Sequence, residues 1–221
     1  MKKNALQEIV VWVVIALPVI YFYWVFNSLP DKVPIHFGLS GQTDAFAPKG
    51  KAWINVGLIA LISACCYLLI KNLARIDPKK TARISLETSL KIAVGVVFFL
   101  SAINFGIIYS TLHGHFNLSK MLNPLMGLFF IYIGNLMHSL KPNYFVGLRI
   151  PWTLENEENW RATHQLGSKI WVAGGFFMLF SGFLLPENAG EIVFAVCVAL
   201  MVIIPSAYSF IYFKKHQKIN L

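Results

Sequence analysis

The chain has 221 residues, of which 57% are hydrophobic and only 13% are charged, and its formal net charge is +9. A soluble domain carries about 25% charged residues, so this composition excludes an ordinary water-soluble protein and predicts a membrane protein. The length leaves no room for a separate soluble domain beside several membrane helices.

Apolar segments long enough to cross a membrane recur along the whole chain. A helix that crosses the roughly 30 Å hydrocarbon core needs about 20 mostly apolar residues. Six segments qualify, none with Asp, Glu, Lys or Arg in its interior: residues 9–26, 53–70, 92–109, 121–140, 170–185 and 192–213. The first has too long an apolar part, and no small-residue cleavage site, for a cleavable signal peptide. We therefore expect an all-α integral membrane protein with six transmembrane helices.

The distribution of lysine and arginine predicts the orientation. If the N-terminus is cytoplasmic, four of the 19 basic residues lie in outer loops and 15 lie inside; the four are Lys32, Lys49, Lys51 and Lys120. Cytoplasmic loops are rich in basic residues, so both termini are expected in the cytoplasm. The net positive charge then reflects this bias and an attraction to anionic membrane lipid, and no direct nucleic-acid binding is expected.

The first connection, residues 27–51, has three prolines and three glycines, which exclude a regular helix. Apolar residues alternate along residues 33–39, which predicts a short extended segment with one apolar face, and Pro34 would confine it to an edge. We expect an ordered outer loop that caps the helices. Its polar side chains able to bind a ligand are His36 and Asp44, which can alternatively bond backbone groups within the loop.

The next two connections and the cysteines offer little chemistry. The basic residues 71–87 suit a lipid surface or an acidic partner, and Pro78 after an Asp predicts that the third membrane helix begins there. His113 and His115 lie around a glycine without a nearby carboxylate or cysteine, which favours a turn over a metal site. The three cysteines lie in apolar segments without metal-ligand spacing, so we expect no disulfide, metal or cofactor.

The fourth connection, residues 141–168, is the one long polar stretch of the chain. Pro142 ends the fourth membrane helix, and Thr153 can cap a new helix whose first turn contains three glutamates. This predicts a cytoplasmic amphipathic helix that runs into the fifth membrane helix. Small or interfacial residues recur every seven positions along that helix and predict a close helix contact: Trp160, Gly167, Gly174 and Ser181, with Gly175 and Gly182 beside them.

Arg149 lies between Gly147 and Pro151, so its backbone is expected to be extended and its side chain to lie off the membrane helices. We expect its guanidinium group to clamp carbonyl groups or the nearby glutamates, with Trp152 buried beneath it. The alternative is that these residues contact a cytoplasmic partner. The candidate partner-binding residues of this connection are Asn143, Arg149, Trp152, Trp160 and His164.

Two motifs resemble known families. Residues 134–167 resemble the signature of the SdpI family of bacterial immunity proteins, through Gly134, Asn135, Asn143, Gly147, Arg149, Pro151, Trp152, Thr153, Leu154, Trp160, Thr163, His164 and Gly167. The first connection is similar to the domain of unknown function DUF1648, through Pro34, His36, Phe37, Gly41, Asp44 and Lys49. We accordingly expect three segments: DUF1648-like residues 1–70, residues 71–120 with the basic loop and third helix, and SdpI-like residues 121–221.

The resemblance implies a protein of the bacterial cytoplasmic membrane that protects its cell from a secreted antimicrobial peptide toxin arriving at the outer face. In the best-known form of the family, the toxin-bound protein also holds a transcriptional repressor at the membrane. The tail at residues 214–221 is short, which weighs against the repressor role more than against immunity. The resemblance implies no enzyme activity.

A membrane transporter and a membrane-embedded hydrolase are the alternatives to an immunity protein. A small membrane transporter usually carries ionisable residues or broken helices at mid-membrane, and the six segments carry no such charge. A membrane-embedded hydrolase would need a nucleophile, metal or carboxylate motif, and the chain has no HExxH, GxSxG or helical DxxD. Glu157 and His164 share a helix face, but the sequence offers them no second source of ligands.

Overall fold

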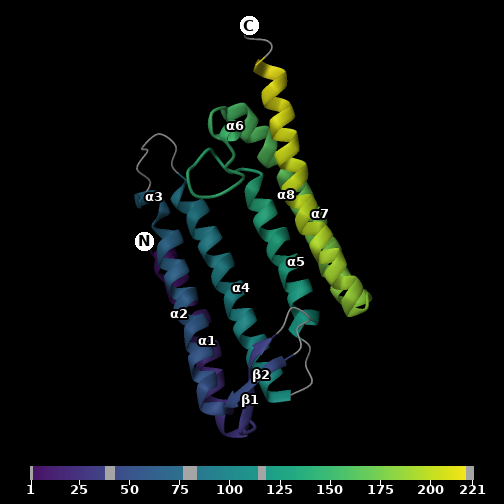
Figure 1. Cartoon of the computed structure of the whole chain (residues 1–221). Helices are drawn as coiled ribbons and strands as arrows, with labels where there is room; N and C mark the ends of the chain where they lie inside the picture. Colours follow the sequence, from purple (N-terminus) through teal and green to yellow (C-terminus); the bar gives the residue numbers. More distant parts are fainter. Residues whose placement is uncertain (1, 38–42, 77–83, 114–117, 218–221) are drawn as a thin grey trace.

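The computed structural model describes residues 2–37, 43–76, 84–113 and 118–217. Its long helices run up and down along one axis (Figure 1). The helices are α1 Lys2–Val25, α2 Ala52–Lys71, α3 Leu73–Ile76, α4 Leu86–His113, α5 Leu118–Met137, α6 Pro151–Leu154, α7 Glu157–Leu184 and α8 Glu187–Gln217. Two strands, β1 Lys32–Phe37 and β2 Thr43–Pro48, lie between α1 and α2, flanked by the short 3-10 turns η1 Phe26–Ser28 and η2 Lys49–Lys51.

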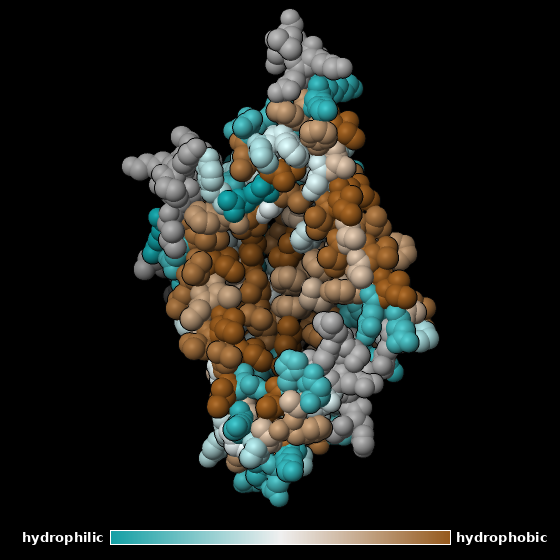
Figure 2. Space-filling model, viewed as in Figure 1, coloured by the Kyte–Doolittle hydropathy of each residue, from teal (hydrophilic) through white to brown (hydrophobic). Residues whose placement is uncertain are grey.

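Five helices, α1, α2, α4, α7 and α8, are long and apolar enough to cross a membrane. The sixth long helix, α5, has 20 residues but is less apolar, because Lys120, Asn123 and Pro124 lie in its first turns. Figure 2 shows a hydrophobic band across the middle of the visible face and hydrophilic residues at both ends of it. The chain is therefore a multi-pass membrane protein, and the crossing by α5 stays a prediction.

The long helices form two halves, one of α1, α2 and α4 and one of α5, α7 and α8, which adjoin where α4 meets α5 (Figure 1). In the first half, Val11 of α1, Tyr67 of α2 and Ala93 of α4 belong to one buried cluster. In the second half, Met178 of α7 and Met201 of α8 pack with side chains of α5. Each half thus has a hydrophobic core of its own.

Glycines bring α5 and α7 into close contact. A methyl group added to Gly127 of α5 would lie 2.6 Å from the carbonyl oxygen of Gly175 on α7. Gly134 and Gly182 are equally tight, against Trp171 and Pro124. The expected close approach along the fifth membrane helix is present, because small residues allow backbones to touch.

The connection after α1 folds as a β-hairpin, which the all-helical expectation did not include. β1 and β2 are antiparallel, with Val33 opposite Ala47 and His36 opposite Ala45, and the register is irregular around His36. Val33 is fully buried and packs with Phe22 of α1 and Val56 of α2. The described part of the loop therefore lies against the ends of the first two helices.

The bundle has two distinct ends (Figure 1). The hairpin marks one, here called the hairpin end, whereas α6, the start of α1 and the end of α8 lie at the opposite one, called the loop end. Near the loop end, α4 begins at Leu86 in the described chain. The expected helix start at Pro78, like His115, lies outside the described residues.

Candidate functional site

The polar connection between α5 and α7 is organised by Asn143. Its side-chain amide donates to the carbonyl groups of Lys141 at 2.9 Å and Val146 at 3.1 Å, and its oxygen accepts from the N–H groups of Phe145 and Val146. Asn143 is almost fully buried. Its hydrogen bonds all serve the turn, and a role in partner binding stays a prediction.

The next turn is built on Gly147 and His164. Gly147 has φ +111°, a conformation that glycine adopts readily and other residues rarely do. A methyl group there would lie 2.3 Å from Nε2 of His164. Nε2 instead accepts a hydrogen bond from the N–H of Leu148 at 3.0 Å, while Nδ1 lies 2.8 Å from the carbonyl oxygen of Trp160. His164 therefore carries its proton on Nδ1 and is neutral in this arrangement.

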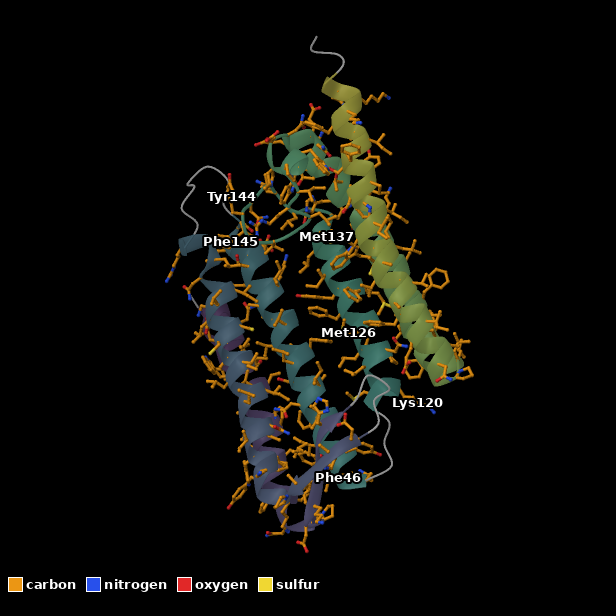
Figure 3. The ribbon with its side chains drawn as sticks, in the orientation of Figure 1. Phe46, Lys120, Met126, Met137, Tyr144 and Phe145 are labelled. Atoms are coloured by element: carbon orange, nitrogen blue, oxygen red, sulfur yellow. The ribbon has the colours of Figure 1, made fainter. Side chains whose placement is uncertain are left out.

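Trp160 fixes the connection to the end of α5. Its indole N–H donates to the carbonyl of Leu140 at 2.8 Å, and its ring stacks on His164 with centroids 4.0 Å apart. Trp160 is fully buried in a cluster that includes Leu73 and Ile92 of the first half. Figure 3 shows that Tyr144 and Phe145 also reach from the connection toward the first half. The loop end is thus where the two halves are joined.

Asn159 links three helices, and the sequence analysis missed it. Its amide group donates to the carbonyl groups of Trp152 at 3.1 Å and Ser209 at 3.0 Å. Its oxygen accepts from the hydroxyl groups of Thr163 at 2.9 Å and Ser209 at 2.8 Å. The four-residue spacings 159–163 and 160–164 were the available signal, because such pairs lie on the same helix face.

The expectation that Thr153 caps the polar helix was wrong. Asn156, not Thr153, caps the polar helix: its side chain accepts from the N–H of Asn159 at 2.8 Å. The hydroxyl of Thr153 instead donates to the carbonyl of Leu148 at 2.8 Å. The polar helix does run into the fifth membrane segment, as predicted, since α7 is continuous from Glu157 to Leu184.

The arginine clamp is also corrected. Arg149 is exposed, and within the described residues it has no hydrogen bond or ion pair. Trp152 is half-buried, with its ring 5.2 Å from that of Phe210 on α8 rather than beneath the guanidinium group. The hydrogen bonds of Asn159, Trp160 and His164 hold this face together instead, which leaves Arg149 open to solvent.

A cavity of about 350 Å³ opens beside these buried residues. Its lining combines basic and acidic side chains with part of Trp160, and includes His138, Lys141, Glu157, Glu158, Arg161 and Gln165. The cavity therefore presents side chains of mixed charge beside the buried polar residues.

At the hairpin end the structure brings together the two residues predicted there. Nδ1 of His36 on β1 lies 2.6 Å from Oδ1 of Asp44 on β2, and both side chains are more than half exposed. In the described part of the chain, no three His, Cys, Asp or Glu side chains gather as metal ligands. This hairpin pair, His36 and Asp44, therefore exposes an imidazole ring and a carboxylate group at the hairpin end.

Comparisons with known proteins agree with these two regions. The SdpI/YfhL protein family matches residues 139–209, which contain the buried polar residues of the loop end. DUF1648 matches residues 13–60, which contain the hairpin. Immunity protein SdpI of Bacillus subtilis (strain 168) is 27% identical over 216 residues, covering 97% of this chain and 98% of the relative. No solved structure matches the chain. The resemblance seen in the sequence is confirmed: one segment of the chain is similar to the SdpI/YfhL protein family and another to DUF1648.

Proposed function

We propose that this chain is an immunity protein of the bacterial cytoplasmic membrane that protects its cell from a secreted peptide toxin. The observation that carries the proposal is the 27% identity to Immunity protein SdpI along nearly the whole of both chains. A match of that extent includes the helices, the hairpin and the loop end together. The role is one of binding rather than catalysis.

The orientation follows from charge. With both termini in the cytoplasm, 15 of the 19 lysines and arginines face the cytoplasm, as the bias of membrane proteins favours. The hairpin end then faces outward, where a toxin arrives, and the loop end faces inward. All six long helices cross the membrane in this arrangement, including α5.

Toxin capture begins at the hairpin end. The exposed His36 and Asp44 offer hydrogen-bonding and charged groups, and Phe46 on the same hairpin is 62% exposed. Such a mixture of aromatic and polar groups suits an amphipathic peptide. The capture keeps the peptide from inserting into the surrounding bilayer.

The loop end supplies the second part of the proposal, which is retention of a transcriptional repressor. The observation that favours it is the cavity lined by Glu158, Arg161 and Lys141, which lies on the face predicted to be cytoplasmic. Exposed Arg149 adds a fork-shaped donor to the same connection. The repressor docks there when toxin is bound.

The test is growth under toxin challenge. A B. subtilis strain lacking Immunity protein SdpI, expressing this chain, is expected to grow at concentrations of the strain's own toxin that kill the empty-vector control. His36→Ala and Asp44→Ala should each lower the protective concentration by about tenfold, the equivalent of losing roughly 1.4 kcal/mol of binding. Membrane levels are measured in parallel by immunoblot.

Lys32→Ala is the matched control, since Lys32 lies on the same hairpin outside the His36–Asp44 pair. It should protect as the unmodified chain does. If cells expressing the unmodified chain at normal membrane levels die like the empty-vector control, the immunity role is wrong.

A further inference from the structure

A large apolar cavity at the hairpin end is separate from the loop-end residues. It has a volume of about 570 Å³ and lies between α4, α5 and the turn from α7 to α8. We call it the outer pocket; its lining is represented by Phe99 and Ile103 of α4, Asn123 and Met126 of α5, and Glu191 and Phe194 of α8. Figure 2 shows a hydrophobic hollow on the face of the molecule between the two halves, and Figure 3 places Met126 there.

Two of the helices that line the pocket, α4 and α5, contact each other nearer the loop end. α4 and α5 stack Phe99 on Phe129 with ring centroids 4.4 Å apart, and nearer the loop end the hydroxyl of Tyr132 donates to the carbonyl of Lys91. Toward the hairpin end, Ile103 and Leu122 line the cavity instead. A membrane-resident molecule can therefore enter from the side, without crossing either half.

The rim of the pocket carries polar groups that lack partners inside the protein. Asn123 is half-buried, and within the described residues its amide makes no hydrogen bond. Glu191 likewise has no ion pair there, whereas Lys120 on the same rim does have an interaction within the protein. The half-buried amide of Asn123 can therefore hydrogen-bond a ligand that carries polar groups of its own.

These features together define one kind of ligand. The apolar walls require large hydrophobic side chains, the free amide of Asn123 matches a peptide group, and the carboxylate of Glu191 matches a cation. Phospholipid acyl chains would fill the walls but would leave a carboxylate beside their anionic phosphate. Charge complementarity therefore favours a cationic amphipathic peptide.

We propose that the outer pocket is the docking site for the toxin, which inserts an apolar anchor between α4 and α5, bonds to Asn123 and pairs a basic group with Glu191. This rests on the proposed immunity function and names its binding site. The hairpin receives the peptide first, and the outer pocket then holds it at the membrane surface.

The test fills the pocket. Ile103→Trp adds bulk inside it, while Ile54→Trp makes the same change on a residue of α2 that is 66% exposed and lines none of these walls. In the strain described above, Ile103→Trp should lower the protective toxin concentration by about tenfold or more, and Ile54→Trp should leave it unchanged. Asn123→Leu and Glu191→Gln should lower it several-fold at normal membrane levels.

Direct binding separates the possible failures. The purified full chain in nanodiscs is titrated with fluorescently labelled toxin of the same B. subtilis strain. Saturable binding that Ile103→Trp weakens and Ile54→Trp does not supports the site. Binding and protection that survive Ile103→Trp, Asn123→Leu and Glu191→Gln overturn the site but leave the immunity function standing.

Three other results overturn the proposal. Phospholipid that copurifies in the pocket and is not displaced by toxin would make it a lipid site. A change of oligomeric state on Ile103→Trp, measured by light scattering, would make it an interface between copies. Absence of both binding and protection in the unmodified chain would remove the immunity function together with the site.

Discussion

Single buried polar residues determine the shape of the loop end. His164 and Asn159 are almost fully buried, and each satisfies its side-chain groups with backbone or hydroxyl partners. A buried polar group that loses its partner costs about 1–3 kcal/mol, so the connection tolerates few other arrangements. Arg149, the most conspicuous charge of the sequence motif, contributes none of these bonds.

Gly147→Ala tests this arrangement. Its φ of +111° and the 2.3 Å approach of a new methyl group to His164 both disfavour alanine. We expect a loss of roughly 1–3 kcal/mol, seen as a lower melting temperature in detergent. Gly50→Ala is the control, because nothing lies within 4 Å of a methyl group there and its melting temperature should not fall. Equal melting temperatures for the two variants would contradict the role given to His164.

At this scale the sequence predicted which residues gather but not what each one does. Asn143, Trp160 and His164 were candidates from the motif, and His36 and Asp44 were candidates from the first connection, but the bond between His36 and Asp44 was not predicted. Arg149 was assigned a clamp because a guanidinium group can reach many acceptors. Asn159 was missed because its partner Ser209 is 50 residues away in an apolar segment, and such pairings depend on tertiary packing.

At the scale of helices, α5 and α7 form the closest pair. The backbone of Gly127 touches that of Gly175, and Gly134 and Gly182 repeat the contact above and below. In a membrane the hydrophobic effect does not drive helices together, so this close packing is a main source of their association. It also explains how α5 is held in the bundle.

Gly127→Ala should separate these helices. The added methyl group would lie 2.6 Å from backbone atoms of Gly175 and Leu179, which cannot rotate away. Overpacking of this kind costs typically about 1–3 kcal/mol and should lower the melting temperature in detergent. Gly57→Ala on α2, where a methyl group meets nothing within 4 Å, should be neutral or stabilising. If Gly127→Ala melted no lower than Gly57→Ala, this account of α5 would fail.

At the scale of the whole molecule, the two halves meet where α4 packs on α5 and at the loop end. Four clusters of buried hydrophobic residues occur in the described chain, and the one around Trp160 and Ile92 contains residues of both halves. The DUF1648 match lies in the first half and the SdpI/YfhL match extends from the end of α5 to α8. The two family matches thus fall in different halves, and α4 and α5 lie between them in the sequence.

The orientation of the chain in the membrane can be checked by labelling introduced cysteines. In a background where Cys65, Cys66 and Cys197 are replaced by alanine, Asp44→Cys should react with a membrane-impermeant maleimide added to intact cells. Glu158→Cys should react after the cells are permeabilised. The reverse pattern would place the loop end outside and refute the topology derived from the basic residues.

Most of the fold could be predicted from apolar length alone. The six segments coincide with α1, α2, α4, α5, α7 and α8, because a run of about 20 apolar residues has few alternatives to a helix. The hairpin was expected only as one extended segment. Its second strand, Thr43–Pro48, has a weaker apolar alternation. It is recognised as a strand only from its pairing with β1. The outer pocket could not be predicted from the sequence, because it depends on how the two halves pack against each other.

The cluster around Trp160 has a mechanical consequence. If the proposed peptide separates α4 from α5 at the outer pocket, the two halves would rotate about the buried cluster that contains residues of both. The outer pocket lies beside Ile103 and Asn123, and the cluster includes Trp160, which also lines the cavity at the loop end. A peptide seated on one side of the membrane would thereby exert torque on the surface exposed at the other, with neither α2–α4 nor α5–α7 having to separate.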